Sequence, residues 1–128
     1  MTALLALDIG NRRTGVAFAD ESSGYIIALD TVRHHTEQEL IDAVIPIVQH
    51  RTIAELIIGL PRLPQGEEGS QAMVARNIGE ALSQSLSIPV MYVDERFTSM
   101  NRVKGTDPDA QAACTLLSIV LDQRKKRE

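Results

Sequence analysis

The chain has little of several residue types, and each shortage argues against a class of function. It has a single cysteine, Cys114, so an internal disulfide is impossible, and the surrounding apolar helical pattern indicates a buried structural thiol rather than a redox centre. Tryptophan is absent and aromatic residues make up only 3%, which disfavours an aromatic platform for stacking bases. The three histidines lack the spacing of a zinc site.

Long hydrophobic runs and an excess of positive charge are also missing. No apolar run reaches the roughly 18 residues of a membrane-spanning helix, so no membrane partner is expected. The opening MTALLALD has no basic leader and meets an acid at Asp8, which makes a poor signal peptide and favours a cytoplasmic location. The net charge of −4 argues against a protein that coats nucleic acid by charge alone.

What is present fits one globular domain. The hydrophobic content of 44% and the charged content of 23% are close to the averages for folded proteins. A length of 128 residues is within the range that one hydrophobic core serves. We therefore expect a single domain over residues 1–128.

Short apolar runs rich in strand-forming residues predict five strands. The turn-like segments GNRR and ESSG separate the first three runs, so two consecutive hairpins and a three-stranded antiparallel meander are expected. The continuous run ELIIGL suits a strand that is buried on both faces. The expected strands cover residues 3–9, 14–20, 24–31, 55–60 and 88–93.

Three helices are expected, and each is introduced by a residue suited to capping. Thr36 and Glu39 fit a capping box at the start of the first helix. Ser70 fits the N-cap of the second helix. Asp107 fits the N-cap of the third, with Pro108 at the first helical position.

The order of these elements predicts an α/β fold with a mixed five-stranded sheet, three antiparallel strands followed by two crossover strands, flanked by α-helices. Sites in such sheets lie beyond the carboxyl ends of central strands. Asp8 lies at the end of the first strand, Asp94 and Glu95 end the fifth, and both strands are expected beside the fourth. Asp109 begins the last helix, so these carboxylates can converge.

A convergence of acids predicts metal chemistry. Two unpaired carboxylates about 4 Å apart repel by roughly 4 kcal/mol at an effective dielectric constant near 20, so the cluster must take up a proton or hold a cation. Oxygen ligands favour Mg²⁺ or Mn²⁺ over zinc or copper. Two such ions can activate water and stabilise the leaving oxygen in phosphodiester hydrolysis. The sequence therefore indicates a divalent-metal nuclease.

The turn after Asp8 adds candidate substrate contacts. Gly10 and Gly15 allow this turn to bend tightly and bring its backbone close to a ligand. Arg12 and Arg13 lie where they can contact phosphates.

Each acid also has an interpretation without a metal, and the residues leave it open. Asp8 could bond the amides of the following turn, as Asp before a turn often does. Asp94 and Glu95 could form a solvated strand end that pairs with Arg96. Asp109 could simply meet the helix dipole favourably.

Several segments together resemble a known family. LALDIGNRRTGVAFAD is similar to the D-x-G-x-[KR]-R-x-G-[VI]-A opening of the YqgF family, Holliday-junction-resolvase-like proteins also described as nucleases of the 16S ribosomal RNA precursor. LIIGLPRLPQGEEGSQA resembles the GLP loop of that family, VDERFTS its DER[LF][TS] element, and PDAQAACTLL its D-[AS]-x-[AS]-A helix start. These blocks occur in family order over nearly the whole chain.

This resemblance implies an RNase H-like fold and a divalent-metal nuclease whose catalytic and metal-binding acids are Asp8, Glu95 and Asp109. Glu95 is preferred to Asp94 by analogy with resolvase-type folds. Alternation along a strand lets only one of the two face the metal, the sequence does not say which, and Asp94 is the alternative ligand. The implied ions are Mg²⁺ or Mn²⁺.

The resemblance further implies a bacterial cytoplasmic protein that acts in ribosome biogenesis, in processing the 5′ end of the 16S ribosomal RNA precursor. Its nucleic-acid partner would be structured RNA or branched DNA. Independently of the resemblance, Arg12, Arg13 and Arg96 are the candidate contacts to the phosphates of that partner. One departure is the connection RFTSMNRVKGTDP, where family members usually carry a longer basic helical segment. The sequence leaves open whether two copies form a homodimer.

Two other functions compete with the nuclease. A catalytically silent module could keep the fold and bind RNA or a ribosome-assembly factor. The D-x-G segment opening a hairpin also resembles the phosphate loop of actin-like and sugar-kinase ATPases. Those proteins bind nucleotide between two such domains, and this chain has residues for only one.

Overall fold

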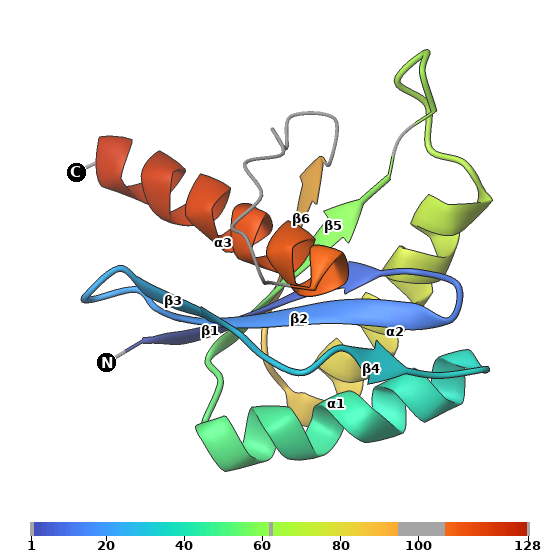
Figure 1. Cartoon of the computed structure of the whole chain (residues 1–128), viewed down its shortest axis with the longest axis horizontal. Coiled ribbons are helices and arrows are strands. Elements are labelled where there is room, and N and C mark those ends of the chain that lie inside the picture. The colour runs from blue at the N-terminus through green and yellow to red at the C-terminus, as the bar shows by residue number, and fades with distance from the viewer. Residues whose placement is uncertain (1, 62, 95–106, 128) are drawn as a thin grey trace.

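The computed structural model describes residues 2–61, 63–94 and 107–127, which form one mixed sheet with helices on both faces (Figure 1). The strands are β1 (Ala3–Ile9), β2 (Arg13–Asp20), β3 (Tyr25–Ala28), β4 (Val32–Arg33), β5 (Glu55–Leu60) and β6 (Val90–Asp94). The helices are α1 (Glu37–Arg51), α2 (Ser70–Leu86) and α3 (Pro108–Lys126). Within the described ranges, none of the helices is long and apolar enough to cross a bilayer.

The sheet has the predicted topology. Its strand order is β3-β2-β1-β5-β6, and the short β4 pairs with β2 beside this path. β1 runs antiparallel to β2 and β2 to β3, whereas β5 is parallel to both β1 and β6. β5 therefore lies between β1 and β6, and the carboxyl ends of these three strands meet at one edge of the sheet.

The third predicted strand, over residues 24–31, is wrong in its extent. β3 ends at Ala28, and the chain pairs with β2 again only at Val32 and Arg33, so the sheet has six strands rather than five. At this interruption one side chain contacts a segment far away in the sequence. Thr31 leaves the ladder and donates a hydrogen bond from its hydroxyl to the Asp107 carboxylate, 3.0 Å away, at the start of α3.

Two of the three predicted helix caps are confirmed. The Thr36 hydroxyl accepts a hydrogen bond from the Glu39 amide at 3.1 Å, while the Glu39 carboxylate accepts from His35 N, one residue before the amide expected in a capping box. Asp107 caps α3 as predicted. Ser70 is not a cap: it is the first residue of α2, and Gly69 takes the N-cap position without a side-chain hydrogen bond.

The sheet divides the hydrophobic core into two layers. α1 and α2 cover one face and α3 covers the other (Figure 1). Along β1, Leu5 and Leu7 belong to the first layer, whereas Leu4 and Ala6 pack with α3. Because side chains alternate along a strand, the next even position of β1, which is Asp8, lies on the α3 face.

The thiol and two neighbouring histidines take up separate environments. Cys114 is partly buried in α3, and this burial raises the pKa of its thiol. His34 is only 6% exposed and shares a hydrogen bond of 2.8 Å between its Nε2 atom and the Thr14 hydroxyl. His35 points elsewhere and its Nδ1 atom accepts a hydrogen bond from Arg12.

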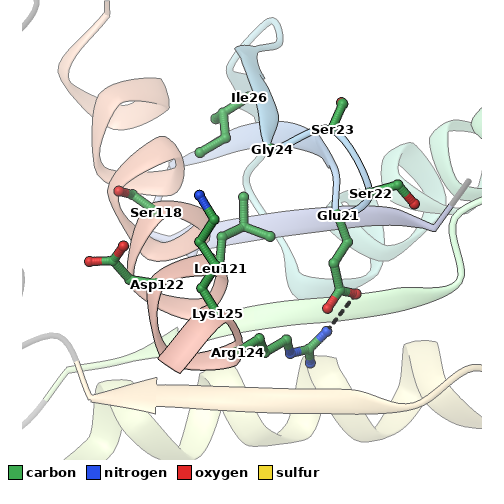
Figure 2. Close-up of a pocket in the computed structure, with 10 residues that line it drawn as sticks. All are labelled: Glu21, Ser22, Ser23, Gly24, Ile26, Ser118, Leu121, Asp122, Arg124 and Lys125. Atoms are coloured by element: carbon green, nitrogen blue, oxygen red, sulfur yellow. Dashed lines mark hydrogen bonds and ion pairs between the residues drawn. The ribbon is translucent and has the colours of Figure 1, made fainter. Parts of the chain in front are cut away.

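The carboxyl-terminal end of α3 is held against the sheet by one arginine. Arg124 donates to the Glu21 carboxylate at 3.0 Å and to both carboxylate oxygens of Glu55 at 2.9 and 2.8 Å. Figure 2 shows the first of these contacts at the edge of a hollow between the β2–β3 turn and the last turns of α3. The two ends of α3 are therefore held by different segments: the β3–β4 connection at the start of the helix, and the β2–β3 turn and β5 at its end.

Candidate active site

Asp8 provides a partly buried carboxylate at the carboxyl end of β1, on the face covered by α3. The turn that follows is closed by the backbone, because Gly10 N donates to the carbonyl of Arg13 at 2.9 Å. Within the part of the chain that the structure describes, no hydrogen bond or ion pair partners the Asp8 carboxylate. The alternative in which Asp8 merely bonds the turn amides is therefore not what the structure shows.

Gly15 brings the start of α3 onto the strand beside Asp8. It pairs directly with Asp8 in the β1–β2 ladder. A Cβ atom on Gly15 would lie 1.7 Å from the carbonyl oxygen of Asp109, so only glycine leaves room for the helix here. The sequence placed Gly15 within the expected strand 14–20 but explained it only by the bend of the turn, so this close approach of α3 was missed. Gly10 does lie in the turn, where its Cβ would be 2.4 Å from the Arg13 carbonyl oxygen.

Asp109 occupies the second position of α3, as predicted, and is held there by the cap. The Asp107 carboxylate accepts from Asp109 N at 2.9 Å and from the Thr31 hydroxyl at 3.0 Å. The hydrogen bond from the Asp109 amide, followed by that from Thr31, lowers the pKa of Asp107 below its usual value. The N-terminal turn of α3 is therefore fixed both by its own cap and by the β3–β4 connection.

Arg13 forms an ion pair with Asp109. Its Nε atom lies 3.3 Å from Asp109 Oδ2, and the two side chains are 58% and 25% exposed. A pair this exposed contributes at most about 1 kcal/mol to stability, so it leaves the Asp109 carboxylate able to exchange its partner. Arg12, the other predicted phosphate contact, is exposed in the same turn and donates to His35.

Of the two acids predicted at the end of the fifth strand, the structure describes Asp94 but not Glu95. Tyr92 packs in the layer of α1 and α2 and Val93 packs with α3, so alternation places Asp94 on the face opposite to Asp8. Glu95 and Arg96 lie outside the described residues. Within the described ranges, no group of three acids, histidines or cysteines is arranged to hold a metal ion, which leaves Asp8 and Asp109 as the two predicted ligands that share one face and one edge.

The residues that the structure does place at this edge fit a hard divalent cation. Their donor atoms are carboxylate oxygens, the ligand type that Mg²⁺ and Mn²⁺ prefer. Asp8 is partly buried and has no hydrogen-bond or ion-pair partner among the described residues, so its carboxylate oxygens are available to a cation.

Sequence reasoning missed Thr31 as a determinant of the site. Its contact with Asp107 joins residues 76 positions apart, and it stands within a segment whose composition is that of an ordinary strand. No periodicity or local motif points to such a contact. Only the N-cap of the helix, Asp107, could be predicted from the sequence.

Comparisons with known proteins identify the family of the chain. A family model described as RuvX: Holliday junction resolvase matches residues 2–123. The chain is 37% identical over 134 residues to a protein of Chloroflexus aurantiacus named "Putative pre-16S rRNA nuclease", covering 95% of this chain and 88% of that protein. A protein of the same name in Synechococcus elongatus is 34% identical over 136 residues, covering 97% and 91% of the two chains.

A solved structure shares the fold. The T. thermophilus RuvC chain in complex with a Holliday junction substrate matches with a TM-score of 0.68, covering 98% of this chain and 96% of that one, at 10% sequence identity. The match confirms the RNase H-like fold that the family resemblance implied.

Proposed function

Because the chain belongs to the RuvX family of Holliday junction resolvases, we propose that it is a divalent-metal-dependent nuclease that hydrolyses phosphodiester bonds. The observation that carries the proposal is the Asp8 carboxylate, which lies partly buried beside Asp109 with no partner in the described part of the chain. We assign both as metal ligands and place the domain over residues 1–128. The reaction is proposed to take place in the cytoplasm.

Glu95 completes the proposed ligand set. Asp94 falls on the face of α1 and α2, opposite to the face that holds Asp8, so it does not reach the same site. This alternation favours Glu95 over Asp94. When bound, Mg²⁺ or Mn²⁺ supplies activation of a water and stabilisation of the leaving oxygen.

The basic residues beside the acids bind and orient the substrate. Arg12 and Arg13 lie in or next to the turn that follows Asp8, where their guanidinium groups contact phosphates that flank the cleaved bond. Arg13 pairs with Asp109 at 3.3 Å and exchanges this carboxylate for a phosphate when nucleic acid binds. Arg96 is a further proposed phosphate contact.

The proposed substrate is structured RNA, namely the 5′ region of the 16S ribosomal RNA precursor, as the names of the relatives indicate. The description of the family model names Holliday junctions instead, so branched DNA is the competing substrate. A cleavage assay on both substrates separates them.

The test is cleavage by the Asp8→Asn variant with Mg²⁺ or Mn²⁺. We expect a loss of at least about 100-fold, because the variant removes a charged group at the reacting centre. Asp42→Asn, which changes an exposed carboxylate on α1, should cleave like the wild type. Titration calorimetry with Mn²⁺ should show weaker binding to Asp8→Asn and Asp109→Asn. Full activity of Asp8→Asn would refute the assignment of Asp8 as a metal ligand. Absence of cleavage by the wild type on both substrates would refute the nuclease and favour a catalytically silent binding module.

A further inference from the structure

A pocket opens beside the turn that follows Asp8, on the face of the sheet covered by α1 and α2. Its volume is about 360 Å³, within the range of small-molecule sites. The turn, the segment that leads into α1, and the first turns of α2 surround it. The lining residues that indicate what it binds are Ile9, Asn11, His34, Glu37, Gln71 and Val74.

Apolar side chains, and side-chain amides without a hydrogen-bond partner among the described residues, make up much of the lining. Ile9 and Val74 contribute partly buried apolar side chains. The side chains of Asn11 and Gln71 are exposed, and neither forms a hydrogen bond or ion pair within residues 2–61, 63–94 and 107–127. His34 is buried, with Nε2 committed to Thr14.

We propose that this pocket binds one nucleobase of the substrate strand, next to the phosphodiester that the acids cleave. The inference rests on the proposed nuclease function, which supplies the strand. Apolar walls suit the faces of a base, and Asn and Gln amides match the donor and acceptor pattern on base edges.

The charge of the lining favours a base over a phosphate. Glu37 contributes a carboxylate, and among the described lining residues none is lysine or arginine. An anion inside the pocket would therefore meet the Glu37 carboxylate, whereas the neighbouring cation, Arg12, lies at the rim, where it is hydrogen-bonded to His35. A base is uncharged at neutral pH and avoids that repulsion.

The position of the pocket links it to the acids. Ile9 and Gly10 line the pocket and directly follow Asp8, so the turn of residues 10–12 forms the rim between the acids and the pocket. A strand that crosses this rim contacts Arg12 with its backbone while the adjacent base enters the pocket. A base held there cannot stay stacked in a helix, so the enzyme should require an unpaired nucleotide beside the cleaved bond.

The test measures binding rather than cleavage. Wild-type protein in EDTA is titrated with short labelled single-stranded RNAs, and then with RNAs that carry an abasic residue at each position in turn. We expect one position at which loss of the base weakens binding. Gln71→Ala should weaken binding of the intact RNA roughly two- to tenfold, the effect of one lost hydrogen bond. On the RNA that is abasic at the sensitive position, Gln71→Ala should have no further effect.

Matched variants on α2 serve as controls. Val74→Phe fills the pocket and should weaken binding of the intact RNA, whereas Met73→Phe changes an exposed neighbour and should not. Gln84→Ala, which removes an amide that bonds Glu80, should also bind like the wild type. The pocket assignment is overturned if Gln71→Ala binds the intact RNA as tightly as the wild type does. It is also overturned if an abasic residue weakens binding at none of the positions. Because no cleavage is measured, this failure is distinct from the failure of the nuclease itself.

Discussion

At the scale of single residues, Gly15 determines how closely α3 approaches the sheet. A Cβ atom there would lie 1.7 Å from the Asp109 carbonyl oxygen and 2.9 Å from Ala110 N, and both are backbone atoms that cannot rotate away. We therefore expect Gly15→Ala to lower the free energy of unfolding by at least about 2 kcal/mol. Urea unfolding followed by circular dichroism would measure it.

The same substitution should weaken Mn²⁺ binding, because it moves Asp109 away from Asp8. Gly69→Ala is the matched control. Its added Cβ would meet only the Leu63 side chain, at 3.3 Å, which can shift. We expect this control to change stability by less than about 1 kcal/mol. Equal stability of Gly15→Ala and the wild type would show that α3 does not pack on β2 in this way.

His34 should make stability depend on pH. Burial lowers the pKa of His34 below 6.5; the charge of Glu39 opposes this shift, whereas His35 and Arg12 add to it. The unfolded chain then binds more protons than the folded one just below pH 6.5, so the stabilising contribution is complete above that pH and decreases as pH falls toward the folded pKa. Urea unfolding at about pH 7.5 and 5.5 should show lower stability at the lower pH.

The control for this pH effect is a second histidine. His34→Gln should reduce the dependence of stability on pH over this interval. His50→Gln, at an exposed position of α1, should leave it as in the wild type. An unchanged slope in His34→Gln would show that another group is responsible.

At the scale of elements, the first turn of α3 depends on a cap that reaches across the fold. Asp107→Ala removes the acceptor for both the Asp109 amide and the Thr31 hydroxyl. We expect a lower melting temperature together with weaker Mn²⁺ binding, because the turn that carries Asp109 loses its two restraints. Scanning calorimetry would give the melting temperature, and titration calorimetry would give the Mn²⁺ affinity.

Thr36→Ala is the matched control, since it removes the cap of α1. It should lower the free energy of unfolding by about 1 kcal/mol and leave Mn²⁺ affinity unchanged. If Asp107→Ala also kept its Mn²⁺ affinity, the cap would have no role in holding Asp109 for the metal.

The elements themselves were largely predictable, because their signals are local. Apolar periodicity and capping residues gave the strands, the three helices and the positions of Thr36 and Asp107. The errors arise from contacts between distant segments. Residues 24–31 read as one strand because nothing near Thr31 reveals its hydrogen bond to Asp107. A tight turn explains a glycine as well as a close helix does, which is why the packing of α3 on Gly15 was missed.

At the scale of the whole molecule, the strand order places the predicted acids. β5 separates β1 from β6 in the sheet, so Asp8 and the end of β6 lie at one edge although more than half the chain separates them in sequence. This convergence followed from the crossover rule for parallel strands. The face on which each acid lies could be read only from packing, which assigns Asp94 to the layer of α1 and α2. Glu95 stays a prediction.

The carboxyl-terminal end of α3 should affect the stability of the protein without affecting cleavage of the substrate. Arg124 bridges Glu21 and Glu55, and all three side chains are less than a third exposed. Burial by itself would lower the pKa of Arg124, but the carboxylates outweigh it and raise the pKa. Arg124→Ala leaves both acids without their shared cation, so we expect a loss of about 1–3 kcal/mol in the free energy of unfolding.

Cleavage at low temperature should persist in Arg124→Ala, because Arg124 lies about 22 Å from Asp109 along the helix axis, at 1.5 Å per residue. Lys125→Ala is the matched control and should match the wild type in both measurements, since Lys125 is exposed and has no ion pair among the described residues. A stable Arg124→Ala that no longer cleaves would instead mean that the substrate extends over the whole length of α3. The hollow beside Arg124 in Figure 2 would then be part of the nucleic-acid surface, and stability and cleavage would no longer belong to opposite ends of the helix.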